Sequence, residues 1–182
     1  SVLGRDVAIT SGNSFTTLMA IEALFLGAEK MHIPYAEAKG AVVGATGSIG
    51  RACALMLSEK VADITLFGNP EHPVSSKNRL NSLTNDLYKY AAQRRNAGNK
   101  EGLAGWLDNV INKLKKDQSS KANSIINFLF DESNINSEVI ETACDYLGIT
   151  PPIDTSLDIE KDLLKCNLIV AASNSPEYLI YP

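Results

Sequence analysis

The feature that most constrains the fold is a glycine-rich turn between a short apolar run and an apolar, Ala-rich segment. The run Ala41–Val43 leads into Gly44, Gly47 and Gly50, and the apolar segment follows at residues 52–57. A buried parallel strand, a tight turn and a helix that starts at the turn produce this pattern. The three glycines then have different roles, because Gly44 lets the chain reverse, Gly47 lets a ligand approach the backbone, and Gly50 lets the helix pack closely against the strand.

The same turn predicts a phosphate-binding site. The N-terminus of a helix offers N–H groups without a helical partner and a partial positive charge, and both attract a pyrophosphate. We therefore expect the turn to bind a dinucleotide through seven consecutive residues: Gly44, Ala45, Thr46, Gly47, Ser48, Ile49 and Gly50. The alternative is a structural strand-to-helix turn in a domain that has lost its ligand.

The next apolar run, Asp63–Phe67, follows at the distance expected for a second parallel strand. It ends in Gly68 and Asn69, where NAD-binding domains carry an acidic residue for the ribose 2′-hydroxyl. Gly68 and Asn69 are uncharged, and Lys77 and Arg79 follow closely, which suits a 2′-phosphate. The sequence therefore favours NADP(H) over NAD(H), with solvated charges at a helix start as the alternative interpretation of the two cations.

The last apolar run, Asn167–Ala172, is typical of a fully buried parallel strand. The carboxyl ends of neighbouring strands form the ligand crevice of a doubly wound sheet. We therefore expect Ala172 and Ser173 beside the nicotinamide half of the cofactor. A weaker strand is predicted either at Gly148–Thr150 or at Ile153.

The spacing of apolar residues predicts helices in most of the remaining chain. They are expected at 15–31, 51–58, 81–95, 103–116, 137–147 and 158–165. Residues 75–147 are interpreted as a mostly helical insertion in the nucleotide-binding fold. Val7–Thr10 is a candidate short strand, and Ser14 is the expected N-cap of the first helix.

Two apolar clusters are assigned to the core. One lies between the predicted helices of the insertion and consists of Ile125, Ile126, Phe128, Leu129 and Phe130, for which a partner-binding surface is the alternative. The other is the inward face of the last helix, formed by Ile159, Leu163 and Leu164.

Composition narrows the class of protein. A chain of 182 residues with 45% hydrophobic residues can bury one core, so we expect a single domain spanning residues 1–182. A net charge of -4 gives no general attraction to nucleic acid or to an anionic membrane, and no apolar run approaches the roughly 20 residues that span a bilayer. Because the chain starts without Met and stops at Tyr181–Pro182, we expect a domain cut from a longer protein.

The histidines and cysteines of the sequence exclude two further kinds of site. Two histidines are too few for a His-based metal site, and no metal site is predicted. The three cysteines, Cys53, Cys144 and Cys166, are far apart and lack C-x-x-C spacing, which argues against a disulfide framework. This cysteine pattern fits a reducing compartment, and we expect a cytoplasmic protein.

Three segments together resemble the NADPH-dependent long-chain acyl-acyl-carrier-protein reductases, and more loosely the amino-acid and shikimate dehydrogenase-like Rossmann domains. The segments are Thr10–Ser14 with the helix after it, Gly40–Gly50, and Leu163–Val170 running into Ala171–Ser173. The resemblance covers roughly residues 8–70 and 153–176. It implies hydride delivery from NADPH to an acyl thioester, which gives an aldehyde.

The resemblance also bears on catalytic and substrate residues. The family's nucleophilic cysteine lies beyond its Rossmann half, and none of the three cysteines here matches it. The turn that contains Asn13 lies near the cleft in the family, which makes Asn13 a candidate substrate contact. The alternative role of Asn13 is turn chemistry at the start of a helix.

The sequence therefore predicts an α/β fold with a Rossmann-like parallel sheet flanked by helices. The expected function is the NADP(H)-binding domain of an oxidoreductase that transfers hydride to a carbonyl or acyl-thioester substrate, with its catalytic residues outside this chain. Two alternatives stay open: a dehydrogenase of an amino-acid-like or other small substrate, and a non-catalytic nucleotide-binding module. The expected partners are a small molecule or an acyl-carrier thioester, and the sequence leaves homo-oligomerisation open.

Overall fold

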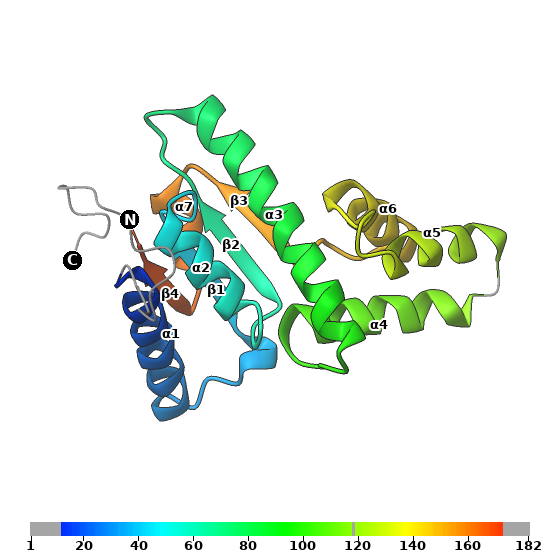
Figure 1. The fold of residues 1–182 in the computed structure, drawn as a ribbon, viewed down its shortest axis with the longest axis horizontal. Coiled ribbons are helices and arrows are strands. Elements are labelled where there is room, and N and C mark those ends of the chain that lie inside the picture. Colours follow the sequence, from blue (N-terminus) through cyan, green and yellow to red (C-terminus); the bar gives the residue numbers. More distant parts are fainter. Residues whose placement is uncertain (1–11, 118, 173–182) are drawn as a thin grey trace, which may run out of the picture.

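The computed structural model describes residues 12–117 and 119–172 and contains one parallel sheet with helices on both faces (Figure 1). The strands are β1 (Lys39–Val43), β2 (Asp63–Phe67), β3 (Ile153–Ser156) and β4 (Leu168–Ala171). Their order in the sheet is β3-β2-β1-β4, and every neighbouring pair is parallel. The α/β class with a Rossmann-like parallel sheet is thus confirmed, and the third strand lies at the later of its two predicted positions.

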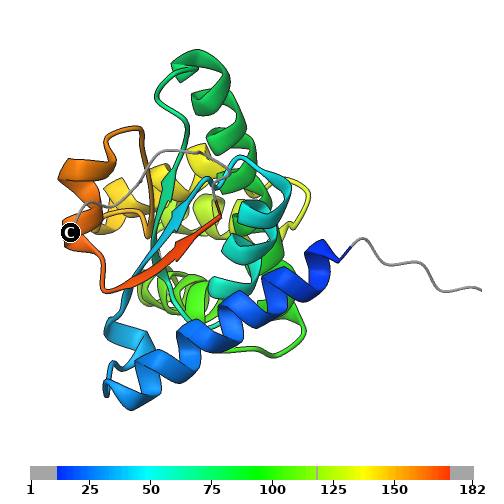
Figure 2. The same ribbon diagram turned by 90° about the vertical axis from the view of Figure 1, so that its left-hand side faces the viewer.

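The helices are distributed unequally between the two faces of the sheet. Along the chain they are α1 (Asn13–Lys30), η1 (Tyr35–Glu37), α2 (Ser48–Leu57), α3 (Pro73–Asn96), α4 (Gly102–Lys116), α5 (Ser120–Phe130), α6 (Ser137–Leu147), α7 (Ile159–Asp162) and η2 (Leu163–Lys165). One face packs against α1, α2 and α3, and the short α7 and η2 lie on the other (Figure 2). Alternate residues of β1, β2 and β4 therefore enter two separate apolar clusters, as the period of a strand requires.

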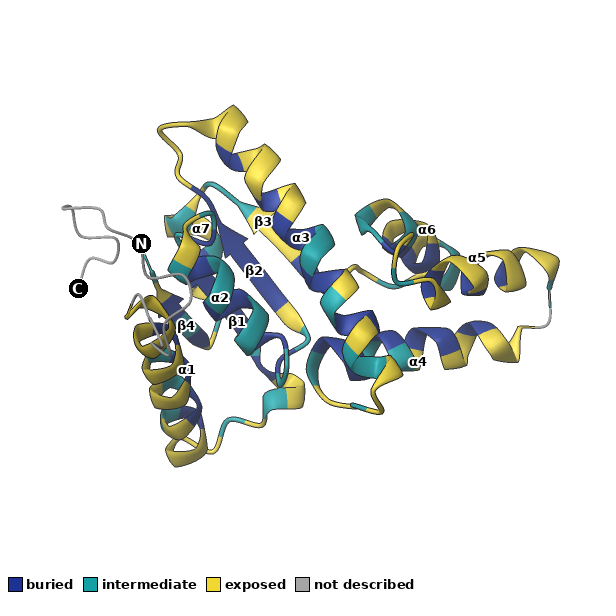
Figure 3. Cartoon of the chain, in the orientation of Figure 1, coloured by how far each residue is buried: buried dark blue, intermediate teal, exposed yellow. Residues whose placement is uncertain are grey.

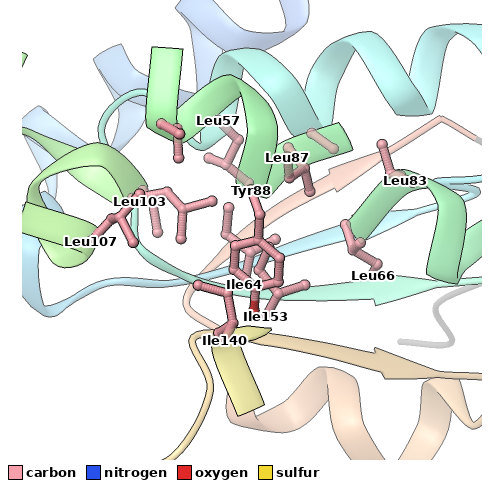
Figure 4. Packing of buried hydrophobic residues seen from close by; sticks show 14 of the residues in the cluster. Leu57, Ile64, Leu66, Leu83, Leu87, Tyr88, Leu103, Leu107, Ile140 and Ile153 are labelled. Atoms are coloured by element: carbon pink, nitrogen blue, oxygen red, sulfur yellow. The ribbon is translucent and has the colours of Figure 1, made fainter. Parts of the chain in front are cut away.

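The first face carries the large core. Val42, Ile64 and Leu66 point from the sheet into a cluster that continues through α3 to α4 and α6. Tyr88 of α3 lies at its centre, with its ring directed toward Ile153 and Ile140 (Figure 4). This single continuous cluster ties the added helices to the sheet.

Helix α3, the first part of the predicted insertion, packs directly on the sheet. Leu80, Leu83 and Leu87 are buried against the sheet, so α3 is the helix that connects β2 toward β3. The additional part is α4–α6, which extends to one side of the sheet (Figure 1). The buried stripes of these helices face one another and α3, and their exposed residues lie on the outside (Figure 3).

Helix starts are the main difference from the sequence prediction. Asn13 opens α1, with Gly12 as its N-cap at φ 77°, so the prediction of Ser14 as N-cap is wrong. The first helical bond already runs from the N–H of Thr16 to the carbonyl of Gly12, at 3.0 Å. Both α2 and α3 also begin earlier than predicted, and Pro73 at the first position of α3 is a start signal that the periodicity missed.

Two core assignments are partly wrong. Ile125, Ile126 and Leu129 are buried, but Phe128 and Phe130 are 53% and 45% exposed. The side of this helix that faces its neighbours is formed by Ala122, Ile125, Ile126 and Leu129, and Phe128 and Phe130 lie on the other side.

The same holds for the short helix before β4. Leu163 is buried and Leu164 is 89% exposed, since the 3₁₀ helix η2 directs consecutive side chains about 120° apart. The candidate strand Val7–Thr10 lies outside the described residues.

Candidate dinucleotide-binding site

The carboxyl ends of all four strands are joined by backbone hydrogen bonds. The N–H of Ala172 donates to the carbonyl of Val43 at 2.9 Å, which joins β4 to β1. The N–H of Ala45 donates to the carbonyl of Phe67 at 3.0 Å, and that of Gly68 donates to Ser156 at 3.0 Å. These bonds place the predicted residues 44–50, Gly68 and Ala172 along one edge of the sheet.

The glycine turn, residues 44–50, lies at the topological switch point of this edge. From β1 the chain passes to β2 and β3 on one side, whereas β4 lies on the other side. Ligands of open α/β sheets bind outside the carboxyl ends of the strands at such a point. The turn connects β1 directly to α2, whose first residue is Ser48.

Two glycines of the turn are required by the protein itself. Gly44 has φ 76°, which side-chain-bearing residues rarely adopt. A Cβ on Gly50 would lie 2.2 Å from the carbonyl oxygen of Gly44, so α2 can approach the turn only without a side chain there. Both roles agree with those assigned from the sequence.

Gly47 is different, because the fold does not require a glycine at this position. Its φ is -82° and its ψ is 166°, a conformation open to any residue. A Cβ on Gly47 would meet only the Gly44 carbonyl oxygen, at an ordinary 3.5 Å, and the residue is exposed. The missing side chain leaves the outer side of the turn clear, as close approach of a ligand to the backbone needs.

The first turn of α2 points its N–H groups at this clear space. Gly47 is the N-cap, and no side chain caps the helix. Backbone bonding resumes at Arg51, whose N–H donates to the Gly47 carbonyl at 2.9 Å. The amides of Ser48, Ile49 and Gly50 are the ones that an α-helix leaves without a partner in its first turn, and they suit an anion.

Of the two residues predicted for the ribose site at the end of β2, Gly68 is packed and Asn69 is exposed. Gly68 is buried, and a Cβ there would lie 3.0 Å from side-chain atoms of Leu80, Leu157 and Ser76, which gives Gly68 a packing role. Asn69 is exposed, and its backbone N–H and carbonyl both bond to the Ser76 hydroxyl, at 3.1 and 2.8 Å. Of the two residues, Asn69 is therefore the one whose side chain is accessible to a ligand at this edge of the sheet.

Glu71 is a residue that the sequence interpretation missed. The Asn69 side-chain oxygen accepts from the Glu71 N–H at 2.8 Å, and the Asn69 amide nitrogen lies 3.5 Å from a Glu71 carboxylate oxygen. This Asx-turn geometry holds the carboxylate beside Asn69, and the N-x-E spacing was the available signal. A carboxylate here can accept from ribose hydroxyls and opposes a 2′-phosphate, so it acts against the NADP(H) preference expected from the nearby cations.

Lys77 and Arg79 lie on different sides of α3. Arg79 is two turns before Asp86, whose carboxylate pairs with Arg51 at the start of α2, so Arg79 shares the side of α3 that faces α2. Lys77 is two turns before Thr84, which lines a hollow on the α6 side of α3. Both are exposed, and Arg79 is the cation on the side of the glycine turn.

Two other predicted contacts lie near the same edge. Ala172 follows β4 directly and is partly exposed, and Ser173 lies outside the described residues. Asn13 is exposed at the start of α1, which lies toward the carboxyl edge because α1 runs antiparallel to the strands (Figure 2).

Two hollows of the described structure lie away from this edge. One of about 610 Å³ is bounded by α3, α6 and β3, and one of about 420 Å³ lies between α1 and α2. Neither is lined by a residue of the glycine turn. We place the candidate site at the turn because the backbone amides without a helical partner are there.

The cysteines do not provide a nucleophile. Burial raises the pKa of the Cys53 and Cys166 thiols, and it raises the pKa of Cys144 to about 11. A thiol with a raised pKa is the protonated, weakly nucleophilic form at neutral pH. Within residues 12–117 and 119–172, no three His, Cys, Asp or Glu side chains are arranged to hold a metal ion.

No protein-family model matches the chain, and no curated protein or solved structure matches it. In the part of the chain that the structure describes, none of the helices has both the length and the apolar character that a bilayer crossing requires.

Proposed function

We propose that this domain binds NADP(H) across the glycine turn and serves an oxidoreductase. The observation that carries the proposal is Gly47, an exposed glycine that the fold does not need, beside backbone amides without a helical partner. A purely structural turn would need only Gly44 and Gly50. The middle glycine, Gly47, is accounted for by a ligand that lies against the backbone.

The roles of the residues follow from their places along the edge. The amides of residues 48–50 bind the pyrophosphate, Asn69 and Arg79 bind the adenosine ribose and its phosphate, and Ala172 lies beside the nicotinamide, with Ser173 assigned there from the sequence alone. The cofactor supplies the hydride, and the chain holds and orients it. A carbonyl or acyl-thioester substrate, with Asn13 in contact, is proposed on the resemblance to the acyl-acyl-carrier-protein reductases.

A non-catalytic nucleotide-binding module is the second candidate. The observation that favours it is Phe128 on the added helix α5, which is 53% exposed although Leu129 beside it is buried. The three free cysteines fit a reducing compartment, and we propose a cytoplasmic location for either candidate.

Calorimetric titration of the purified chain with NADPH and, separately, with NADH tests the proposal. We expect a micromolar dissociation constant for NADPH and a weaker one for NADH. Equal affinities, or a higher affinity for NADH, would assign the site to NAD(H). Glu71 would then outweigh Arg79 in the choice of cofactor. No binding of either nucleotide would overturn the proposed function and leave the glycine turn structural.

Arg79→Ala tests which cation binds the 2′-phosphate. We expect a roughly tenfold weaker affinity for NADPH, or about 1.4 kcal/mol, because a single charged contact is lost. Affinity for NADH should not change, since NADH has no phosphate at that position. Lys77→Ala is the matched control, being exposed on the other side of the same helix, and should alter neither affinity. Equal losses for both nucleotides in Arg79→Ala would contradict this assignment.

A further inference from the structure

The hollow of about 610 Å³ lies on the opposite side of the sheet's strands from the glycine turn, at their amino ends. Lys39, Asp63 and Ile153, the first residues of β1, β2 and β3, line it. The rest of its wall comes from α3, from α6 and from the loop before β3. Its volume is within the roughly 300–1,000 Å³ of small-molecule sites.

A buried hydroxyl group without a partner belongs to the wall of this hollow. Thr84 of α3 is only 6% exposed, and its hydroxyl makes no hydrogen bond to the described residues. A threonine inside a helix can bond to the carbonyl four residues before it, which here belongs to Leu80, but Thr84 does not. A buried polar group without a partner is costly, and a hydrogen-bonding molecule in the hollow removes that cost.

The charges of the wall determine which molecules suit the hollow. Lys39, the cation among the described lining residues, is paired with Asp63 at 3.5 Å. Glu141 of α6 and Asp154 of β3 form no ion pair with a described residue. Lys165 is close enough to act on Asp154, but its own ion pair, at 2.6 Å, is with a carboxylate of α7. The wall therefore has an excess of negative charge, which attracts a cation.

Most of the other lining residues are polar. They carry hydroxyl groups or a side-chain amide, and they are Asn81, Ser137, Thr150 and Thr155. An ammonium group donates up to three hydrogen bonds and suits both carboxylate and hydroxyl oxygens. The volume is far larger than a single metal ion needs, and it accommodates a short carbon chain between amine groups.

We propose that this hollow binds a small organic polyamine, with ammonium groups at Glu141 and Asp154 and an amine N–H that donates to the Thr84 hydroxyl. The two carboxylates belong to different elements, so a molecule with separated ammonium groups contacts both, whereas a monoamine contacts one. The bound polyamine joins the added helix α6 to α3 and β3. This site does not rest on the proposed nucleotide function, since the glycine turn lies at the other ends of the strands.

Calorimetric titration of the purified chain with spermidine tests the proposal. We expect a dissociation constant below about 1 mM that rises with added salt. Glu141→Gln and Asp154→Asn should each weaken binding roughly tenfold, because a charge-assisted hydrogen bond is lost. Glu138→Gln is the matched control: Glu138 is exposed one turn earlier on α6 and outside the hollow, so the same change of charge should leave the affinity unaltered.

Thr84→Val tests the role of the buried hydroxyl. Valine has nearly the same shape, and it replaces an unpartnered polar group by a methyl group, so the thermal unfolding midpoint of the free protein should stay the same or rise. The affinity for spermidine should fall roughly three- to tenfold, because one neutral hydrogen bond is lost. A lower midpoint with unchanged affinity would mean that the hydroxyl is bonded within the protein, and would contradict its assignment to the ligand.

Three further results would overturn the proposal. One is the absence of spermidine binding by the folded wild-type chain. The second is an equal loss of affinity in Glu138→Gln and Glu141→Gln, which would mean a general attraction to an acidic protein. The third is equally tight binding of triethylene glycol, an uncharged chain, or displacement of spermidine by an equal concentration of Mg²⁺, since either would assign the hollow to another class of ligand.

Discussion

We expect Gly47→Trp to abolish nucleotide binding without unfolding the domain. The indole would occupy the outer side of the glycine turn, where the pyrophosphate has to approach the amides of α2. A loss of at least roughly a hundredfold in affinity, or about 2.8 kcal/mol, is expected for NADPH and NADH alike. Because Gly47 has an unstrained backbone and free space at its Cβ, the thermal unfolding midpoint should stay close to that of the wild type.

Gly47→Ser is the matched control for this experiment. Serine is a good N-cap, so this change should maintain or slightly raise the stability of α2 while obstructing the turn far less. Calorimetry and thermal unfolding would be measured on both variants. Normal NADPH binding by folded Gly47→Trp would show that the nucleotide does not lie over this turn.

The opposite behaviour is expected of Gly50→Ala, which should destabilise the whole domain. A Cβ at this position would lie 2.2 Å from the Gly44 carbonyl oxygen and 2.9 Å from the Ala45 Cα, and both are backbone atoms that cannot rotate away. Either α2 must move away from β1 or the turn must distort. We expect a loss of about 2–4 kcal/mol in the free energy of unfolding, or roughly 5–15 °C in the midpoint.

Urea denaturation compares this loss with the effect of an unobstructed glycine. Gly27→Ala in the interior of α1 meets no atom within 4 Å and should stabilise the domain by about 0.5–1 kcal/mol through helix propensity. An unchanged unfolding midpoint in Gly50→Ala would mean that α2 does not pack on the turn as described. Together, Gly47 and Gly50 separate the binding role of the turn from its structural role.

The sequence alone was sufficient for the strand-turn-helix unit and for the parallel sheet. Apolar runs that end in glycine or asparagine are local signals, and Val43, Phe67 and Ala171 all end strands within a residue or two of the prediction. The first residues of the helices were harder to predict, because a polar helical turn, such as the one that begins at Pro73, has no apolar periodicity.

The candidate site could be predicted in composition but not in arrangement. Which of Lys77 and Arg79 faces the glycine turn depends on the pairing of Arg51 with Asp86, a contact between residues 35 positions apart. The position of Glu71 depends on a side-chain turn at Asn69. The exposure of Phe15, Leu18 and Met19 on α1 could not be predicted either, since which apolar residues of a helix are buried depends on the elements that pack against it.

The two edge strands of the sheet, β3 and β4, differ in how readily a further strand can pair with them. At one end β3 is preceded by Pro151 and Pro152 and has Asp154 at its second position, and both features oppose pairing with a further strand. At the other end β4 contains only Leu168–Ala171, without a charge or a proline. Any strand that extends this sheet will therefore add beside β4, next to the nicotinamide end of the proposed site and away from the adenosine end.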